Sequence, residues 1–328
     1  METIFFSIII PLYNRPEEIK ELLLSLCLQT YTHFEVLVIE DGSKNRAEDL
    51  MIHFYNKLNI RYFYKPNSGQ GFSRNFGFER AEGEYFIIFD SDVLVPEKYL
   101  EIVNETIQKE KLDAYGGPDA AHPSFTPLQK AISYSMTSVF TTGGIRGKNT
   151  QVSKVFHPRS FNMGISREVW EKTKGFKITR SGEDIELSIR IKELGFHSAL
   201  IPEAFVYHKR RTNFEQFFKQ VHFFGRARIN IYSFFPNELK WVHFIPALFT
   251  IFCGITLLSF LFLFNGLFLI CITFLILFCL LIFIDSSLKN KSLYIGFLSV
   301  SASFVQLIGY GIGFITDFIK RILLRHQS

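Results

Sequence analysis

The sequence predicts an open α/β sheet domain followed by helices that lie in or across a membrane. Over the first 210 residues, short apolar runs rich in β-branched and aromatic residues alternate with helical patterns, as in sheets of buried parallel strands. After Lys240 the chain becomes almost uniformly apolar. We therefore expect a sheet domain at 1–210, an interfacial helix segment at 211–240 and a membrane region at 241–328.

The composition of the chain narrows the classes of function. Its 328 residues suffice for one large domain or two ordinary ones, and the formal net charge of +5 is too weak to indicate a nucleic-acid partner. The cysteines form no Cys-x-x-Cys pair, which argues against a disulfide framework or a zinc site. Residues 1–10 lack the basic start and cleavage site of a signal peptide, so we expect the sheet domain to stay in the cytoplasm.

The first predicted element is a strand at 5–10. A helix opened by Pro16 follows it, and further strands are expected at 34–39, 61–64 and 85–89, with a second helix after Gly71. Open α/β sheets bind ligands beyond the carboxyl ends of their strands. The residues that follow each strand are therefore the candidates for function.

The first three strands are followed by residues suited to a nucleotide. Pro11 and Tyr13 follow the first strand. Glu40-Asp41 ends the second before a glycine, where a carboxylate can accept hydrogen bonds from a base or ribose, although Asp is also a common turn residue. After the third strand, two glycines precede a helix that carries Arg74, an arrangement suited to a diphosphate. The segment has neither a Walker lysine nor the three-glycine dinucleotide fingerprint.

Acidic residues and a histidine follow the later strands. In Asp90-Ser91-Asp92 two carboxylates repel each other unless a cation compensates, and magnesium or manganese suits such oxygen ligands; a solvated turn is the alternative. His208 could complete a metal site, although a lone histidine is more often structural. Glu183-Asp184 opens a helix, where acids suit the helix dipole, or Asp184 could be a general base.

The segment 213–234 is predicted to be a helix lying in the membrane interface. Apolar residues recur there at helical spacing and basic residues interleave with them. An amphipathic helix packed on the sheet domain is the alternative. The apolar positions are Phe214, Phe217, Phe218, Val221 and Phe224, and the basic positions are Lys219, Arg226 and Arg228.

The last third of the chain predicts membrane spans. No Asp, Glu, Lys or Arg occurs between 241 and 284, which predicts spans at about 243–264 and 267–284 with a turn at Asn265-Gly266. These spans carry no charge and are too few to enclose a pore, which argues against a transporter or channel. A full third span at 293–316 would place Lys320 and Arg321 outside, against the positive-inside rule. Either this segment breaks at its glycines and re-enters, or the rule does not hold here.

In this order and spacing, the segments resemble the family 2 glycosyltransferases, which have a GT-A (Rossmann-like) fold that binds a nucleotide-sugar. The tail resembles that of the membrane-bound bacterial members. The matching segments are SIIIPLYN at 7–14, EVLVIEDGSK at 35–44, NSGQGFSRNFG at 67–77, DSD at 90–92, FNMGISR at 161–167, GEDIEL at 182–187 and VYH at 206–208.

The resemblance implies a role for each matching segment. Asp184 would be the catalytic base of a single displacement that inverts the anomeric centre, and Asp92 and His208 would bind a divalent metal, magnesium or manganese. The nucleotide-sugar would contact Pro11, Tyr13, Glu40, Asp41, Arg74, Asp90 and Ser91. The acceptor side would be lined by Asn162, Met163, Gly164 and Glu183.

The sequence departs from the family pattern at two places, and these departures refine the reaction that we expect. The usual Asp-Asp pair before the glycine is Glu40-Asp41 here, and the Gln-x-x-Arg-Trp motif of processive polysaccharide synthases is missing. We therefore expect transfer of one sugar, with Arg226 or Arg228 clamping the pyrophosphate. The expected donor is a UDP-sugar. The expected acceptor is a lipid-linked glycan at the cytoplasmic face of the inner membrane, as in cell-surface polysaccharide assembly. The alternatives are an inactive membrane scaffold that retains a nucleotide pocket and a sugar nucleotidyltransferase.

Overall fold

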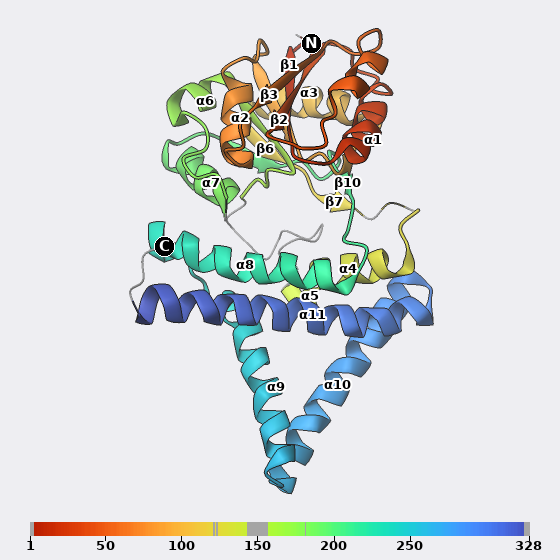
Figure 1. Cartoon of the computed structure of the whole chain (residues 1–328), viewed down its shortest axis with the longest axis vertical. Helices are drawn as coiled ribbons and strands as arrows, with labels where there is room; N and C mark the ends of the chain where they lie inside the picture. The colour runs from red at the N-terminus through yellow and green to blue at the C-terminus, as the bar shows by residue number, and fades with distance from the viewer. Residues whose placement is uncertain (1–2, 121, 123, 143–156, 181, 325–328) are drawn as a thin grey trace. The chain divides into compact units, whose positions relative to one another are not determined.

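A computed structural model describes residues 3–120, 122, 124–142, 157–180 and 182–324. The chain forms two compact units, the first made of 1–122 and 153–209 and the second of 123–152 and 210–328 (Figure 1). The sequence predicted one uninterrupted domain up to residue 210, whereas the structure assigns residues 123–152 to the second unit. Helices α4 (Pro127–Thr137) and α5 (Val139–Thr142) belong to the second unit. Apolar residues of α4 pack there against Phe217 and Ala302, which come much later in the chain.

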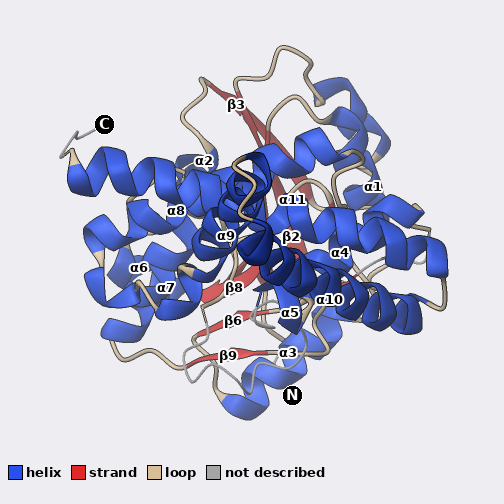
Figure 2. Ribbon diagram, turned by 90° about the horizontal axis from the view of Figure 1, so that it is seen from below, coloured by secondary structure: helices blue, strands red, loops and turns tan. Residues whose placement is uncertain are grey.

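The first unit is built on a mixed sheet with strand order β3-β2-β1-β4-β8-β6-β9 (Figure 2, red). The four predicted strands are confirmed and run parallel to one another: β1 (Phe6–Leu12), β2 (Phe34–Asp41), β3 (Ile60–Lys65) and β4 (Tyr85–Phe89). The later strands are β6 (Ala114–Gly116), β8 (Asn162–Ser166) and β9 (Ser198–Leu200). Strand β8 is antiparallel to both β4 and β6, which the sequence did not predict.

Helices cover both faces of this sheet, because side chains alternate along each strand. Ile8 of β1 packs in a core with helices α1 (Pro16–Leu26) and α3 (Tyr99–Glu110) and the short 3₁₀ helix η1 (Glu48–His53). Its neighbour Ile9 points to the opposite core. That core is formed with α2 (Gln70–Phe78), α6 (Arg167–Thr173) and α7 (Glu183–Glu193).

A small second sheet brings distant residues to one edge of the unit. It has the order β5-β10-β7, with β5 (Val93–Leu94), β7 (Asp119–Ala120) and β10 (Val206–His208). In the antiparallel ladder between β10 and β5, His208 stands opposite Val93. Since Val93 directly follows Asp92, this pairing places His208 beside the end of β4.

The second unit contains the long apolar helices (Figure 1). α8 (Phe214–Phe234) and α11 (Leu293–Asp317) lie side by side, while α9 (Ile245–Leu261) and α10 (Asn265–Asn290) form a hairpin that projects from them. Short turns η3 (Pro236–Glu238) and η4 (Trp241–His243) connect α8 to α9, and η5 (Phe318–Leu323) follows α11. Among the residues that the structure describes, three helical stretches are long and apolar enough to cross a membrane: 241–261, 265–290 and 293–323.

Two details differ from the predicted spans. The hairpin turns before Asn265, which already begins α10, and Leu263 in that turn has a φ of 57°. One alternative placed a break at the glycines of the third segment, but helix α11 runs through them unbroken. These glycines instead allow close packing, because a Cβ on Gly309 or Gly313 would lie 2.6 Å or less from atoms of α8.

Candidate functional site

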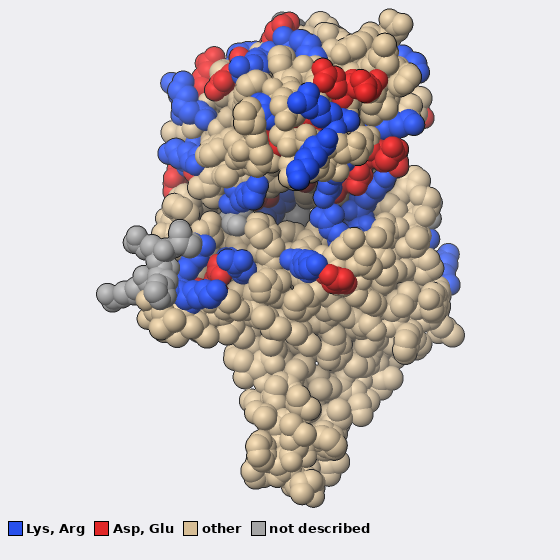
Figure 3. Space-filling view, in the orientation of Figure 1, with Lys and Arg blue, Asp and Glu red and all other residues tan. Residues whose placement is uncertain are grey.

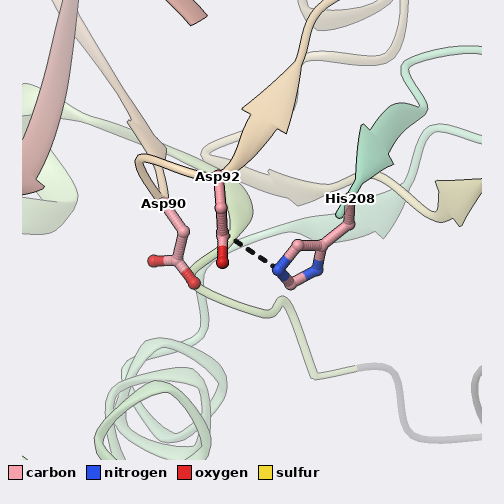
Figure 4. Close-up of side chains that lie close together, drawn as sticks. All are labelled: Asp90, Asp92 and His208. Atoms are coloured by element: carbon pink, nitrogen blue, oxygen red, sulfur yellow. Dashed lines mark ion pairs between the residues drawn. The ribbon is translucent and has the colours of Figure 1, made fainter. Parts of the chain in front are cut away.

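Two carboxylates and an imidazole converge at the end of β4. One ligand atom each of Asp90, Asp92 and His208 lies within 4.8 Å of the others (Figure 4). The imidazole Nε2 is 3.2 Å from Oδ1 of Asp92, and its ring stacks on Phe161 with 5.0 Å between ring centroids. Carboxylate oxygens with one imidazole suit magnesium or manganese, so the residues fit the divalent metal expected from the sequence.

A cation from the chain itself already touches this cluster. Nη1 of Arg15 donates a 2.7 Å hydrogen bond to Oδ2 of Asp92. Asp92 is nearly buried, whereas about a third of the Arg15 side chain is exposed (34%). No motif in the sequence indicated a role for Arg15. Its position could have indicated a functional role, because Arg15 follows the first strand at the sheet edge where functional residues were expected.

Arg74 links the two acidic parts of the site. Its side chain has no solvent exposure, and its guanidinium lies 2.8 Å from Asp90 and 3.4 Å from Glu183. It also lies over the ring of Phe176, 5.3 Å from the centroid. The sequence suggested that Arg74 reaches a phosphate. The structure commits its guanidinium to two carboxylates, so Arg74 fixes the position of Asp90 relative to Glu183.

The two acids at the start of α7 have different surroundings. Glu183 is buried, and Nε2 of Gln70 donates a hydrogen bond to it. Burial, and then the nearby Asp184, raise the pKa of Glu183, while Arg74 opposes that shift. Asp184 is more accessible, with 16% of its side chain exposed, and lies 3.6 Å from Nη1 of Arg159. Of the two acids, Asp184 is the more exposed to solvent, and Glu183 contacts Arg74.

Asp41 anchors the glycine-containing loop that precedes α2. Its carboxylate accepts hydrogen bonds from the backbone N–H groups of Ser68 and Gly69, each at 2.8 Å, and forms an ion pair with Lys65. Burial would raise the pKa of Asp41, but the hydrogen bonds from Lys65 and Ser68 outweigh burial and lower it. Lys65, which the sequence analysis did not consider, therefore keeps Asp41 ionised and the loop ordered.

Several of the predicted site residues have side chains that are buried in the fold. Glu40 is fully buried and accepts hydrogen bonds from the Ala47 N–H and the Tyr62 hydroxyl. Asn162 is also fully buried and donates to the Ala204 carbonyl at 2.8 Å. Met163 and Gly164 lie in the same strand, β8, and are buried too. These residues pack inside the sheet, and a role for them at a nucleotide or an acceptor stays a prediction.

The remaining predicted residues are placed as follows. Tyr13 is half exposed (51%), Pro11 is partly buried and Ser91 is buried. In the second unit, Nε of Arg226 donates a 2.8 Å hydrogen bond to Asp317, a nearly buried carboxylate. Arg228 lies on the same helix, α8. A pyrophosphate role for either arginine stays a prediction.

Comparison with known proteins points to one family. Residues 7–173 match the family model described as glycosyl transferase family 2. An uncharacterized glycosyltransferase of Rickettsia bellii is 28% identical over 242 residues, which cover 73% of this chain and 34% of that protein. A similar protein of Rickettsia felis is 32% identical over 187 residues, covering 56% of this chain and 30% of that protein. The chain thus matches about a third of the length of these relatives.

Solved structures share the fold at low sequence identity. The mannosyltransferase PcManGT from Pyrobaculum calidifontis, solved in complex with GDP-Man and Mn2+, superposes with a TM-score of 0.55 at 15% identity, covering 71% of this chain and 65% of that one. TarS 1–349 of S. aureus, in complex with UDP-GlcNAc, gives a TM-score of 0.51 at 21% identity, covering 69% of this chain and 66% of that one. At these identities the likeness shows the GT-A fold.

Proposed function

The chain belongs to glycosyl transferase family 2, and on that premise we propose that it moves one sugar from a UDP-sugar to a lipid-linked glycan acceptor at the cytoplasmic membrane face. The observation that carries the proposal is the convergence of Asp90, Asp92 and His208. The buried Arg74 joins Asp90 of this cluster to Glu183, the residue that precedes Asp184. The apolar helices 241–261 and 265–290 support a membrane location for the acceptor.

In the proposed reaction, an acceptor hydroxyl attacks the anomeric carbon from the side opposite the nucleotide. Asp184 takes the proton of that hydroxyl as the new C–O bond forms and the bond from the sugar to the diphosphate breaks, which inverts the anomeric centre. A magnesium or manganese ion held by Asp92 and His208, with Asp90 nearby, would offset the negative charge on the departing nucleoside diphosphate. Arg74 keeps the two halves of the site in register by binding Asp90 and Glu183 together.

The choice of nucleotide and acceptor is part of the proposal. Both solved neighbours were bound to a nucleotide-sugar, GDP-Man in one case and UDP-GlcNAc in the other, which supports a donor of this class. The membrane helices support an acceptor that is itself anchored in lipid, because the acceptor hydroxyl must then be presented close to the bilayer surface.

The test is turnover of a panel of UDP-, GDP- and TDP-sugars by the full chain in detergent or nanodiscs, with and without manganese and with extracted membrane lipids as acceptors. We expect metal-dependent release of a nucleoside diphosphate from one donor, lost in Asp92→Asn. The exposed Asp49→Asn, on η1, is the matched control and should retain turnover.

Binding of a donor without turnover under any condition would favour the scaffold alternative. Formation of a nucleotide-sugar from a sugar phosphate would favour the nucleotidyltransferase.

A further inference from the structure

Helices α8 and α11 are packed in direct backbone contact. A Cβ on Gly225 of α8 would lie 2.1 Å from the carbonyl oxygen of Tyr310, and one on Gly313 of α11 would lie 2.1 Å from the carbonyl oxygen of His222. Such distances are possible only because both positions are glycine. Small residues at a helix interface let two backbones approach closely and fix the helices against each other.

Further contacts along α8 and α11 show the relative direction of the two helices. Val221 lies against Gly309, Arg226 pairs with Asp317, and Nη1 of Arg321 donates a 2.9 Å hydrogen bond to Asn230. The partner number on α11 rises with the number on α8, so the two helices run parallel and in register over several turns. The two helices must therefore have the same inclination to a membrane, so that α11 can cross it only if α8 does.

Helix α8 cannot occupy the hydrocarbon core. It carries Glu215, Lys219, Arg226 and Arg228, and the Lys219 and Arg226 side chains are 72% and 46% exposed. A charged residue near the centre of a spanning helix costs about 2.5–3.5 kcal/mol on the insertion scale. Several such charges outweigh the apolar face of α8, whereas an amphipathic helix at the headgroup level keeps them in water. In Figure 3, the second unit shows a few charged side chains along α8 and near the end of α11, and the visible face of the projecting hairpin shows none.

Helix α11 also differs from the hairpin helices in its burial. Half of its most apolar window (50%) is buried inside the protein, against 17% and 11% for the windows of α9 and α10. Its exposed apolar residues form one stripe, and the opposite side, with Ser299, Ser303 and Gln306, is buried against the other helices. The stripe contains Leu293, Phe297 and Ile312 of α11 and continues with Ile319 and Leu323 of η5.

We propose that α11 does not cross the membrane but lies beside α8 in the cytoplasmic interface, so that only the α9–α10 hairpin enters the bilayer. The partner of the two-helix face is the inner-leaflet lipid surface. The apolar stripe of α11 contacts acyl chains, and Lys320 and Arg321 stay at the level of anionic headgroups. This arrangement satisfies the positive-inside rule without a break in α11. It holds whether or not the chain transfers a sugar.

The first test is the side of the membrane on which the end of α11 lies. In a full-length variant with its native cysteines replaced, single cysteines are introduced by Phe264→Cys, Lys291→Cys and Leu324→Cys and labelled with an impermeant maleimide. We expect Phe264→Cys to react in intact cells, and the other two only after permeabilisation. Labelling of Leu324→Cys in intact cells would overturn the proposal. An unchanged melting midpoint of the cysteine-free variant shows that the fold is retained.

The second test separates a helix in the interface from one that re-enters the bilayer. Spin labels are placed on the exposed stripe through Phe297→Cys and Ile312→Cys, and their depths in nanodiscs are measured from oxygen and nickel accessibility. We expect equal, shallow depths. A spanning or re-entrant α11 would separate the two labels by about 20 Å, because a helix rises 1.5 Å per residue. Ile270→Cys and Ile284→Cys, exposed on α10, are the control pair and should show that separation.

Discussion

Arg15 binds the same carboxylate that the site offers to a metal, with its Nη1 2.7 Å from Oδ2 of Asp92. A divalent ion and a guanidinium at one carboxylate repel each other, so Arg15 would weaken metal binding for as long as the nucleotide is absent. The diphosphate of a nucleotide-sugar carries the negative charge that relieves this repulsion. The geometry therefore favours joint binding of metal and nucleotide over binding of metal alone.

Replacing Arg15 should change the metal affinity of the nucleotide-free protein. We expect Arg15→Gln to tighten manganese binding about two- to five-fold without nucleotide, because a partly exposed ion pair is worth up to ~1 kcal/mol. Binding of the metal–nucleotide complex should weaken in the same variant. Titration of free manganese by electron paramagnetic resonance measures both. Arg80→Gln removes a similar exposed pair after α2 and should change neither. Weaker manganese binding without nucleotide would contradict the prediction.

The general base should be separable from donor binding. We expect Asp184→Asn to lower kcat of sugar transfer by ~10²–10⁴ and to leave the dissociation constant of the donor within about two-fold, because a base acts on the acceptor hydroxyl. Glu183→Gln should weaken donor binding as well, because it loosens Arg74 and with it Asp90. Steady-state kinetics and calorimetry of the two variants test this. Equal losses of donor binding in both variants would argue against the assignment.

Asp41 should make stability depend on pH. Its pKa is lowered in the folded protein, so the ionised form stabilises the fold above the ordinary value of 3.8, and this contribution is lost as the pH falls through the lowered pKa. We expect the difference in melting midpoint between the native chain and Asp41→Asn to be largest near pH 6 and to shrink below about pH 3.8. The exposed Asp49→Asn serves as control. A difference that stays constant with pH would contradict this prediction.

The glycines between α8 and α11 should not tolerate a side chain. We expect Gly225→Ala to destabilise the second unit by ~1–3 kcal/mol, because its Cβ would meet the Tyr310 carbonyl oxygen and overpack the interface. Gly254→Ala, on α9, is the matched control, because no atom lies within 4 Å of the added Cβ. Melting midpoints in detergent provide the measurement. The same loss for both substitutions would point to a general effect of glycine replacement.

Arg226 can be tested for a structural role against a role in pyrophosphate binding. Arg226→Ala leaves the buried Asp317 with Arg321 as a remaining partner and should destabilise the protein by ~1–3 kcal/mol. Asp317→Asn in the same chain should recover part of that loss. If Arg226 also clamps pyrophosphate, Arg226→Ala alone raises the donor KM while Asp317→Asn does not. Unchanged kinetics in both Arg226→Ala and Arg228→Ala would remove the clamp from the proposal.

The sequence predicted the parallel part of the sheet and the family, because buried parallel strands are readable as apolar runs. It also predicted that Asp90, Asp92 and His208 share a site, and the structure brings them together. Arg15 was missed because a basic residue after a strand carries no pattern of its own. Its importance comes from the distance to Asp92, which lies far along the chain.

The structure differs from the sequence-based prediction where long-range contacts decide the outcome, because a pattern along the sequence does not report such contacts. Asn162 is held inside the sheet by Tyr99 and Ala204, residues that no spacing rule connects to it. The orientation of β8 is likewise set by its pairing with β4 and β6. Hydropathy identified 293–316 as membrane-compatible, yet the glycine contacts with α8 decide where that helix lies, and hydropathy does not report contacts.

The ladder between β10 and β5 also bears on how such a chain can change over evolution. The position of His208 relative to Asp92 depends on its pairing with Val93 and not on the length of chain that separates them. Loops inside that stretch can lengthen, shorten or acquire new acceptor preferences while the histidine keeps its place. A slip of one residue within β10 would instead turn the imidazole to the other face of the small sheet. Insertions in the loops are therefore tolerated where a single-residue deletion in the strand is not.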